Sequence, residues 1–256
     1  MFDLLLLGLL FGILWMVGAW LIYLLVKNPA IVDLAWAMCV VGITILYFFI
    51  AIPQSFIPII ALFSILLWGV RLSSLLIYRL SIHKVDKRYE LLDEKWKKNL
   101  KKSYFFFFVF QGIGAFIISL PLAFIINYDA HFSLMSLIGL FFVILGFIGL
   151  TIADIQLQSF KSKQKNKQKV CNIGLWHYSR HPNYFFEWVF WVGQFLFAIY
   201  LPWGFLAIIS PLGLLYLLLF VTGIPPAEEQ SLSSKKQAYE EYQRTTNAFF
   251  PWLPKK

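Results

Sequence analysis

The chain has 256 residues, of which 60% are hydrophobic and only 14% are charged, and its mean hydropathy is +0.72. A soluble domain of this length does not need so much apolar surface, so the composition excludes a soluble globular protein and indicates a polytopic membrane protein. The net charge of +9 comes from basic residues beside apolar segments, which is a signature of membrane topology. The sequence contains no nucleic-acid-binding motif.

The apolar runs are long enough for helices that cross a bilayer. A hydrocarbon core about 30 Å thick needs roughly 20 apolar residues in helical form. Seven runs satisfy this requirement, and we expect an all-α membrane protein with seven transmembrane helices in a single domain over residues 1–256. The predicted helices are 4–26, 34–52, 56–78, 104–127, 133–156, 184–201 and 204–223.

The distribution of Lys and Arg predicts the orientation. Of 22 basic residues, nine lie between 79 and 102, six between 161 and 180 and five between 235 and 256, whereas "IPQS", "NYDAH" and "LPW" contain none. Because Lys and Arg accumulate in cytoplasmic loops, we expect the N-terminus outside and the C-terminus in the cytoplasm. The membrane is expected to be a bacterial inner membrane or an endoplasmic reticulum.

Four ionisable residues fall inside the predicted helices. They are Asp33, Arg71, Asp154 and Glu187. A charge in the bilayer costs several kcal/mol unless it is paired or faces a polar cavity, so each is a candidate functional residue. Buried ion pairs that fix helix register are the simpler interpretation, but three acids against one base leave charge for a ligand to neutralise. All four lie in the cytoplasmic halves of their helices, which predicts a polar cavity open to the cytosol.

The stretch "GLWHYSRHPNYFFEWVFW" (174–191) combines a basic turn with an apolar helix. Pro182 is typical of the first turn of a helix. The free N–H groups of that turn, with Arg180 and His181 beside them, predict an anion site for a phosphate or diphosphate. The alternative for His181 alone is an ordinary loop residue.

Two further patterns indicate polar lining. Asp154, Gln158 and Lys161 recur at helical spacing on one face, although a solvated helix end would have the same pattern. Asn183 and Glu187 are one turn apart, and an amide beside a carboxylate can hold a carboxamide such as nicotinamide.

The segment 224–256 is predicted to form an amphipathic helix on the cytoplasmic face. Tyr239, Tyr242 and Phe249 are available to cap the cavity, and surface anchoring is the alternative role. The two cysteines predict neither a disulfide nor a metal site.

The motifs "NIGLWHYSRHPNYFFEWVFWVG", "IADIQLQSFK", "FQG" before "SLPL" and "YEEYQRTTNAFFPW" together resemble the steroid 5α-reductase (3-oxo-5α-steroid 4-dehydrogenase) family, from about Asp33 to Pro251. The resemblance implies a seven-helix enzyme that binds NADPH from the cytoplasm and reduces a carbon–carbon double bond conjugated to a ketone. It also implies that Asp154, Lys161, Asn183 and Glu187 contact the cofactor.

The resemblance further implies that Arg88 and Tyr89 contact the phosphates and that Tyr239 and Tyr242 belong to a cofactor-covering tail. Leu150 stands where a polar residue is usual. Together with the patterns above, the candidate cofactor-binding residues are Arg88, Tyr89, Asp154, Gln158, Lys161, Arg180, His181, Asn183, Tyr184, Glu187, Tyr239 and Tyr242.

The family polarises its ketone with a carboxylic side chain on the second helix and a tyrosine one turn before an arginine on the third. Asp33 occupies the first region, but Trp68 stands three residues before Arg71 where the tyrosine is expected. Indole is only a donor, so Tyr78 or Tyr89 replaces the tyrosine, protonated Asp33 holds the ketone, or the substrate is not a 3-oxo steroid. The candidate catalytic residues are Asp33, Trp68, Arg71 and Tyr89.

A rival class shares part of the pattern. Isoprenylcysteine carboxyl and phospholipid methyltransferases, which use S-adenosylmethionine, also have an Arg-His-Pro-x-Tyr turn and paired glutamates, here Glu228 and Glu229. Phe186 stands where their motif has Gly, which argues against this class. A transporter or scaffold is disfavoured because the buried charges lie toward one side of the membrane. We therefore expect hydride transfer from NADPH to a lipophilic enone that enters from the lipid. The sequence leaves the oligomeric state open, and a monomer is compatible with it.

Overall fold

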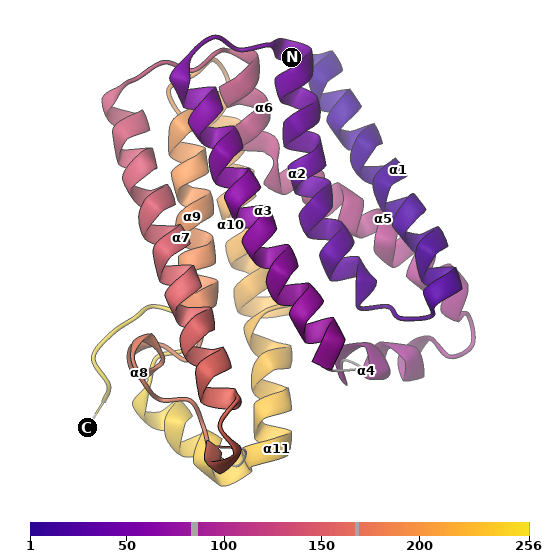
Figure 1. Ribbon diagram of the computed structural model, residues 1–256, viewed down its shortest axis with the longest axis vertical. Helices are drawn as coiled ribbons and strands as arrows, with labels where there is room; N and C mark the ends of the chain where they lie inside the picture. The colour runs from indigo at the N-terminus through magenta and orange to yellow at the C-terminus, as the bar shows by residue number, and fades with distance from the viewer. Residues whose placement is uncertain (83–86, 167–168, 256) are drawn as a thin grey trace. The chain divides into compact units, whose positions relative to one another are not determined.

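The computed structural model describes residues 1–82, 87–166 and 169–255, and every regular element in these ranges is helical. The longer helices in Figure 1 are α1 (Phe2–Val26), α2 (Ile31–Ala51), α3 (Phe56–Ile82), α5 (Leu100–Ile118), α7 (Leu134–Lys161), α9 (Pro182–Ala198) and α11 (Ile224–Thr245). The shorter elements are α4 (Lys87–Trp96), α6 (Leu120–Asn127), η1 (Gln164–Asn166), α8 (Leu175–Tyr178), η2 (Gly204–Ile208), α10 (Ile209–Tyr216) and the π-helix η3 (Leu217–Val221).

Six helical segments in the described ranges are long and apolar enough to cross a membrane, which agrees with an integral multi-pass protein. They are Phe2–Val26, Ile31–Ala51, Phe56–Ser81, Leu100–Ile118, Leu134–Lys161 and Gly204–Thr245. The other predicted span, 184–201, corresponds to α9, whose 17 residues give a length of about 25 Å. The count of seven spans and the orientation of the termini stay predictions.

Three predicted helices are interrupted or shortened in the structure. The expected helix 104–127 breaks at Ser119, because Pro121 lacks the N–H that a continuous helix would need. The expected helix 204–223 is divided into η2, α10 and η3. The segment 224–256 is helical only to Thr245 and has a non-helical residue inside it at Lys235.

The chain packs as two compact units. The first contains Met1–Leu137 and Phe195–Ser210, and the second contains Ile138–Gln194 and Pro211–Lys256. The single domain expected for residues 1–256 stays a prediction beside this division.

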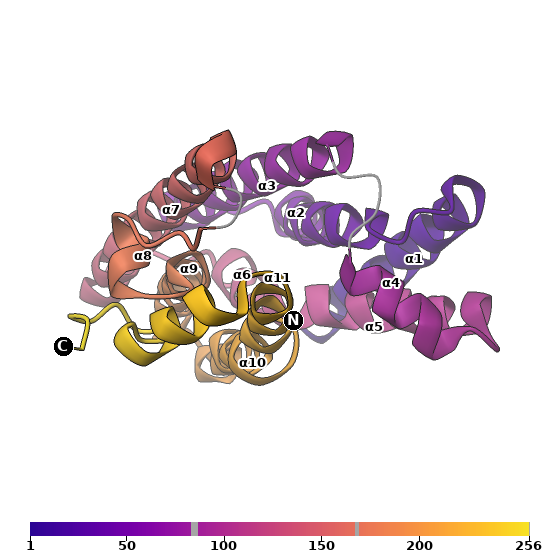
Figure 2. The ribbon, with the colours of Figure 1, turned by 90° about the horizontal axis from the view of Figure 1, so that it is seen from below.

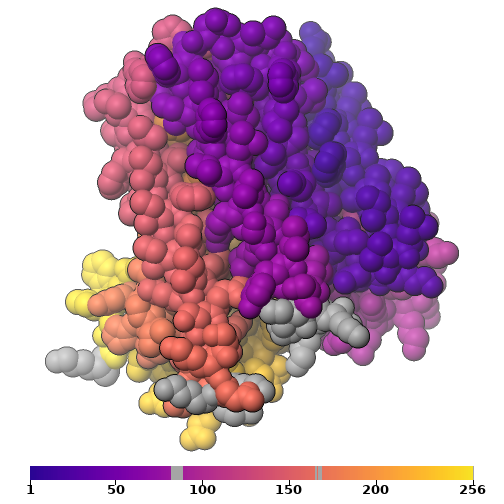
Figure 3. Space-filling model, in the orientation of Figure 1, coloured from indigo at the N-terminus to yellow at the C-terminus, as the bar shows by residue number. Residues whose placement is uncertain are grey.

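In the first unit, α1 packs against α2 and α5, and α2 packs against α3. Side chains of α1, α2 and α3 form a closed surface on the face shown in Figure 3. The contact between α1 and α5 depends on two glycines. A Cβ atom on Gly12 would lie 2.8 Å from the carbonyl oxygen of Gly112, and a Cβ atom on Gly112 would lie 2.6 Å from that of Gly12. The two backbones therefore touch, as small residues permit in membrane helix pairs.

In the second unit, α7 and α9 use the same device. A Cβ atom on Gly146 would lie 2.5 Å from the backbone nitrogen of Phe190, and one on Gly149 would lie 2.3 Å from Cδ1 of Phe186. Gly146 thus faces Phe190, and Gly149, further along α7, faces Phe186, which comes earlier in α9. The two helices are therefore antiparallel. This close contact fixes the register of α9 against α7.

The α1–α5 contact can be tested with a matched pair of substitutions. Gly12→Ala is expected to lower the free energy of unfolding by about 1–3 kcal/mol, because a methyl group there forces two backbones apart. Gly18→Ala on the same helix has no atom within 4 Å of the added Cβ atom and is expected to be neutral or slightly stabilising. Unfolding of the detergent-solubilised protein, followed by tryptophan fluorescence, measures both. Equal loss in the two variants would contradict the contact.

Candidate functional site

The start of α9 is built from a buried serine and a proline. Ser179 is fully buried and extended, and its Oγ accepts a hydrogen bond from the N–H of His181 at 3.1 Å. The same Oγ donates to the carbonyl oxygen of Phe249 at 2.8 Å. Pro182 then begins the helix, where its missing N–H is not needed. The sequence prediction that a helix starts at this turn is confirmed.

The basic pair of this turn contacts one carboxylate. Arg180 Nε donates to Glu228 Oε1 at 2.7 Å, and His181 Nε2 lies 3.2 Å from the same oxygen. Gln243 Nε2 donates to the other oxygen of Glu228 at 2.6 Å. We call Arg180, His181, Glu228 and Gln243 the clasp. It joins the start of α9 to both the first and the last turns of α11.

The guanidinium group of Arg180 also caps the end of α11. Its Nη1 donates to the carbonyl oxygens of Gln243 at 3.1 Å and Thr246 at 2.6 Å. These carbonyls lie at the negative end of the helix dipole, where a cation is favourable. Arg180 and His181 thus contact protein groups in this structure, and their predicted role in binding a phosphate stays a prediction.

Backbone contacts extend the clasp into the C-terminal tail. The N–H of Arg180 donates to Asn247 O at 2.8 Å, and the hydroxyl of Tyr242 donates to the carbonyl oxygens of Trp176 and Ser179. Figure 2 shows α8 beside α11 and the C-terminal segment. Tyr242 therefore holds the turn before α9 from the side of the tail, and Tyr239 is buried close to it, with ring centroids 5.9 Å apart.

Asn183 and Glu187 follow the clasp along α9. Asn183 Oδ1 is buried and has no hydrogen-bond partner among the described residues. Glu187 Oε1 accepts a hydrogen bond from Trp191 Nε1 at 3.0 Å. Tyr184 stacks on the imidazole of His181, with ring centroids 5.3 Å apart and planes at 5°.

The α7 residues predicted for the site differ in burial. Asp154 is 7% exposed, Gln158 is half-buried and Lys161 is exposed. Since Gly149 faces Phe186 in an antiparallel pair, the next turn of α7, which contains Asp154, is level with the first turn of α9. The bond from Trp176 Nε1 to Ala153 O at 2.9 Å agrees with this register. Asp154 and Asn183 therefore share one level of the second unit.

The predicted catalytic residues belong to the first unit. The hydroxyl of Tyr89 donates to Asp33 Oδ1 at 2.9 Å, and Tyr89 is buried. Trp68 is fully buried and contacts Trp36, with ring centroids 6.0 Å apart, while Arg71 is half-buried. Of the two tyrosines considered as replacements, Tyr89 reaches the carboxylate, whereas Tyr78 is 50% exposed. The side chain of Arg88 lies outside the described part of the chain.

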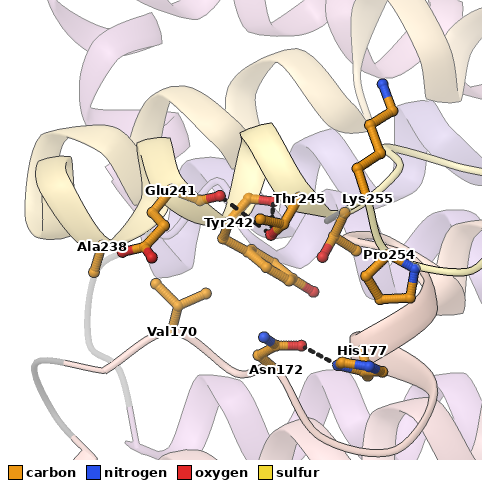
Figure 4. Close-up of a pocket in the computed structure, with 10 residues that line it drawn as sticks. Val170, Asn172, His177, Ala238, Glu241, Tyr242, Thr245, Pro254 and Lys255 are labelled. Carbon is orange, nitrogen blue, oxygen red and sulfur yellow. Dashed lines mark hydrogen bonds between the residues drawn. The ribbon is translucent and has the colours of Figure 1, made fainter.

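A pocket of about 450 Å³ opens in the second unit beside the tail (Figure 4). Asn172 and His177 lie on one side, joined by a hydrogen bond of 3.1 Å, and Glu241 and Tyr242 of α11 lie on the other. The ammonium group of Lys255 points away from the pocket in Figure 4. The ring of Tyr242 and these polar groups line the pocket, and its volume lies in the lower half of the usual range for ligand sites.

Sequence reasoning missed the central residue of the clasp. In the sequence, Glu228 was noted only as one of two adjacent glutamates that suggested the methyltransferase class. No sequence pattern indicated a functional role for Gln243. The available signal was the Pro-Pro pair at 225 and 226, which starts a helix and puts Glu228 in its first turns, where a carboxylate is favourable.

A comparison with protein-family models finds one match. The model described as "Protein of unknown function (DUF1295)" matches residues 19–246. Comparisons with curated proteins and with solved structures find no match.

The clasp is expected to stabilise the second unit. Glu228→Ala should lower the free energy of unfolding by about 2–3 kcal/mol, less than for a fully buried ion pair because the two side chains are 11% and 15% exposed. Glu229→Ala, at the adjacent exposed residue, is the control and should change it little. Thermal unfolding of purified protein checks both, and equal effects of the two variants would refute the role of the clasp.

His181 predicts how stability depends on pH. Burial lowers the pKa of His181 below its ordinary value of 6.5, although the bond to Glu228 opposes the shift. The unfolded chain therefore binds a proton more readily than the folded protein does. The contribution of neutral His181 to the free energy of unfolding is fully present above about pH 7 and is lost as the pH decreases through about 6.5. The unfolding temperature measured across this range should show that slope, and His181→Gln should reduce it. An unfolding temperature that rises on acidification would contradict the assignment.

Proposed function

This chain belongs to the DUF1295 family of proteins of unknown function, and we propose that it is a membrane oxidoreductase that transfers a hydride from NADPH to the carbon–carbon double bond of a lipophilic enone. The observation that carries the proposal is the pair on the first turns of α9. Asn183, whose buried amide oxygen has no hydrogen-bond partner in the described part of the chain, precedes the carboxylate of Glu187 by one turn, beside the level of the buried Asp154. The resemblance to steroid 5α-reductases supports the same reading.

The residues fit a dinucleotide in two respects. A buried amide oxygen without a partner is costly, and a ligand N–H would remove that cost. Asn183 and Glu187 would hold the carboxamide, and the pocket beside Tyr242 would take one nucleoside. NADPH, when bound, supplies the hydride. Because Arg180 is engaged in the clasp, the phosphates would rely on other basic groups such as Lys161.

The protein's own contribution to the reaction lies at the oxygen of the substrate. Reduction at the β-carbon would move the electrons of the double bond toward the carbonyl, so negative charge would grow on the carbonyl oxygen. A hydrogen bond donated to this oxygen becomes stronger as the negative charge grows. Within the first unit, Tyr89 is the candidate donor; its single O–H hydrogen is donated to Asp33 in this structure, so a bond to the substrate oxygen would replace that bond. A proton from solvent would then be added at the α-carbon to complete the reduction.

A methyltransferase that uses S-adenosylmethionine is the second candidate. The contact of the Arg-His-Pro turn with Glu228, the first of the paired glutamates, favours it, because both motifs of that class meet at one point. Phe186 weighs against it. Its ring packs on Gly149, so it fills the space that a glycine in the methyltransferase motif leaves for a cofactor.

Ligand-dependent thermal stabilisation of the detergent-solubilised protein distinguishes the two. NADPH at about 100 times its Kd should stabilise the folded form by roughly 2.7 kcal/mol, while S-adenosylmethionine should have no effect. Asn183→Ala and Glu187→Gln should abolish most of the NADPH shift, whereas Gln230→Ala, at an exposed position of α11, should retain it. A shift with S-adenosylmethionine alone, or an NADPH shift unchanged in both α9 variants, would contradict the proposal.

The rate of NADPH oxidation tests the proposed role of Tyr89 in the first unit. With a 3-oxo-Δ4-steroid as probe, Tyr89→Phe should keep the NADPH shift but reduce NADPH oxidation by about 10²-fold or more. Tyr78→Phe, at an exposed tyrosine, should leave it unchanged.

A further inference from the structure

The tail after α11 exposes large apolar side chains although its backbone is fixed. Phe250, Trp252 and Leu253 are 56%, 71% and 72% exposed, and we call these three residues the tail patch. The N–H of Trp252 donates to Tyr178 O at 2.9 Å, and the N–H of Lys255 donates to Thr245 O at 2.7 Å. The tail is thus bonded at both ends and still directs its apolar groups outward.

The tail patch adjoins the first turns of α9. The ring of Phe250 lies 5.8 Å from that of Phe185 and 6.2 Å from that of Trp188. These residues begin the apolar part of α9, directly after the polar turn at Pro182. The patch therefore continues the apolar surface of α9 toward the end of the helix where the charged clasp lies.

The composition of the tail indicates what covers it. Tryptophan and phenylalanine beside a lysine are typical of the boundary between lipid headgroups and acyl chains, where an aromatic ring is buried and a cation meets anionic lipid. Pro251 and Pro254 prevent a helix, so this is a fixed loop and not an extension of α11. α9 is short for a hydrocarbon core of about 30 Å, and an apolar loop at its start lengthens the surface that lipid can cover.

We propose that the tail patch is a membrane-docking surface, occupied by the headgroup and upper acyl region of the bilayer that surrounds the spanning helices. Lipid contact there holds the tail against Tyr178 and the start of α9. The proposal is independent of the reaction that the protein performs.

Site-directed fluorescence tests the docking surface. In a background with the buried Cys39 and Cys171 replaced by Ala, an environment-sensitive label is attached to Trp252→Cys, to Leu253→Cys and, as control, to Gln237→Cys at an exposed polar position of α11. Each labelled protein is placed singly in nanodiscs of phosphatidylcholine and phosphatidylglycerol that carry a nitroxide high on the acyl chain. The nitroxide reports lipid contact, and iodide reports contact with water.

Labels at positions 252 and 253 should be quenched by the nitroxide at least about threefold more than the control, which should be quenched mainly by iodide. Quenching by iodide equal to that of the control would overturn the proposal, because the patch would then face water. Protection from both quenchers would also overturn it, since protein would then cover the patch. Size-exclusion profiles and unfolding temperatures equal to those of the unlabelled background confirm that each variant folds.

Discussion

The ion pair between Arg180 and Glu228 determines how the start of α9 is held against α11. A buried charged group needs a partner, and here one carboxylate serves both Arg180 and His181 while Gln243 satisfies its second oxygen. The same contacts fix both ends of α11 to the turn before α9. The clasp therefore also holds Asn183 and Glu187 in place, because they lie on the first two turns of the helix that follows it.

The close contacts of glycines supply the second constraint. Because Gly146 and Gly149 let α9 approach the backbone of α7, the helices cannot slide or rotate without a clash, and Asp154 stays level with Asn183. A polar set built in this way is rigid at the level of the backbone, which a binding site needs. In the first unit, the hydrogen bond from Tyr89 to Asp33 likewise fixes the hydroxyl group and the carboxylate relative to each other.

Much of this could be predicted from the sequence, and the failures have physical causes. Apolar runs and the Pro182 turn gave most helices, since hydropathy and the missing proline N–H act locally. The break at Ser119 was missed because the apolar run continues through Pro121, and hydropathy does not register a missing backbone N–H. The partner of Arg180 was missed because Glu228 is 48 residues away, and a pairing over that distance leaves no local pattern. The hydrogen bond between Tyr89 and Asp33 was not predicted, because the sequence left Tyr78 and Tyr89 as equal alternatives and only tertiary packing brings one of them to Asp33.

The central claim is that a nucleotide binds at the start of α9 and beside Tyr242. Hydrogen–deuterium exchange with and without saturating NADPH tests it most directly, because exchange reports local protection along the whole chain. The account predicts slower exchange in peptides that cover residues 170–187 and 238–246, and no change in α1. Unchanged exchange in both stretches, or protection there with S-adenosylmethionine and not with NADPH, would contradict it.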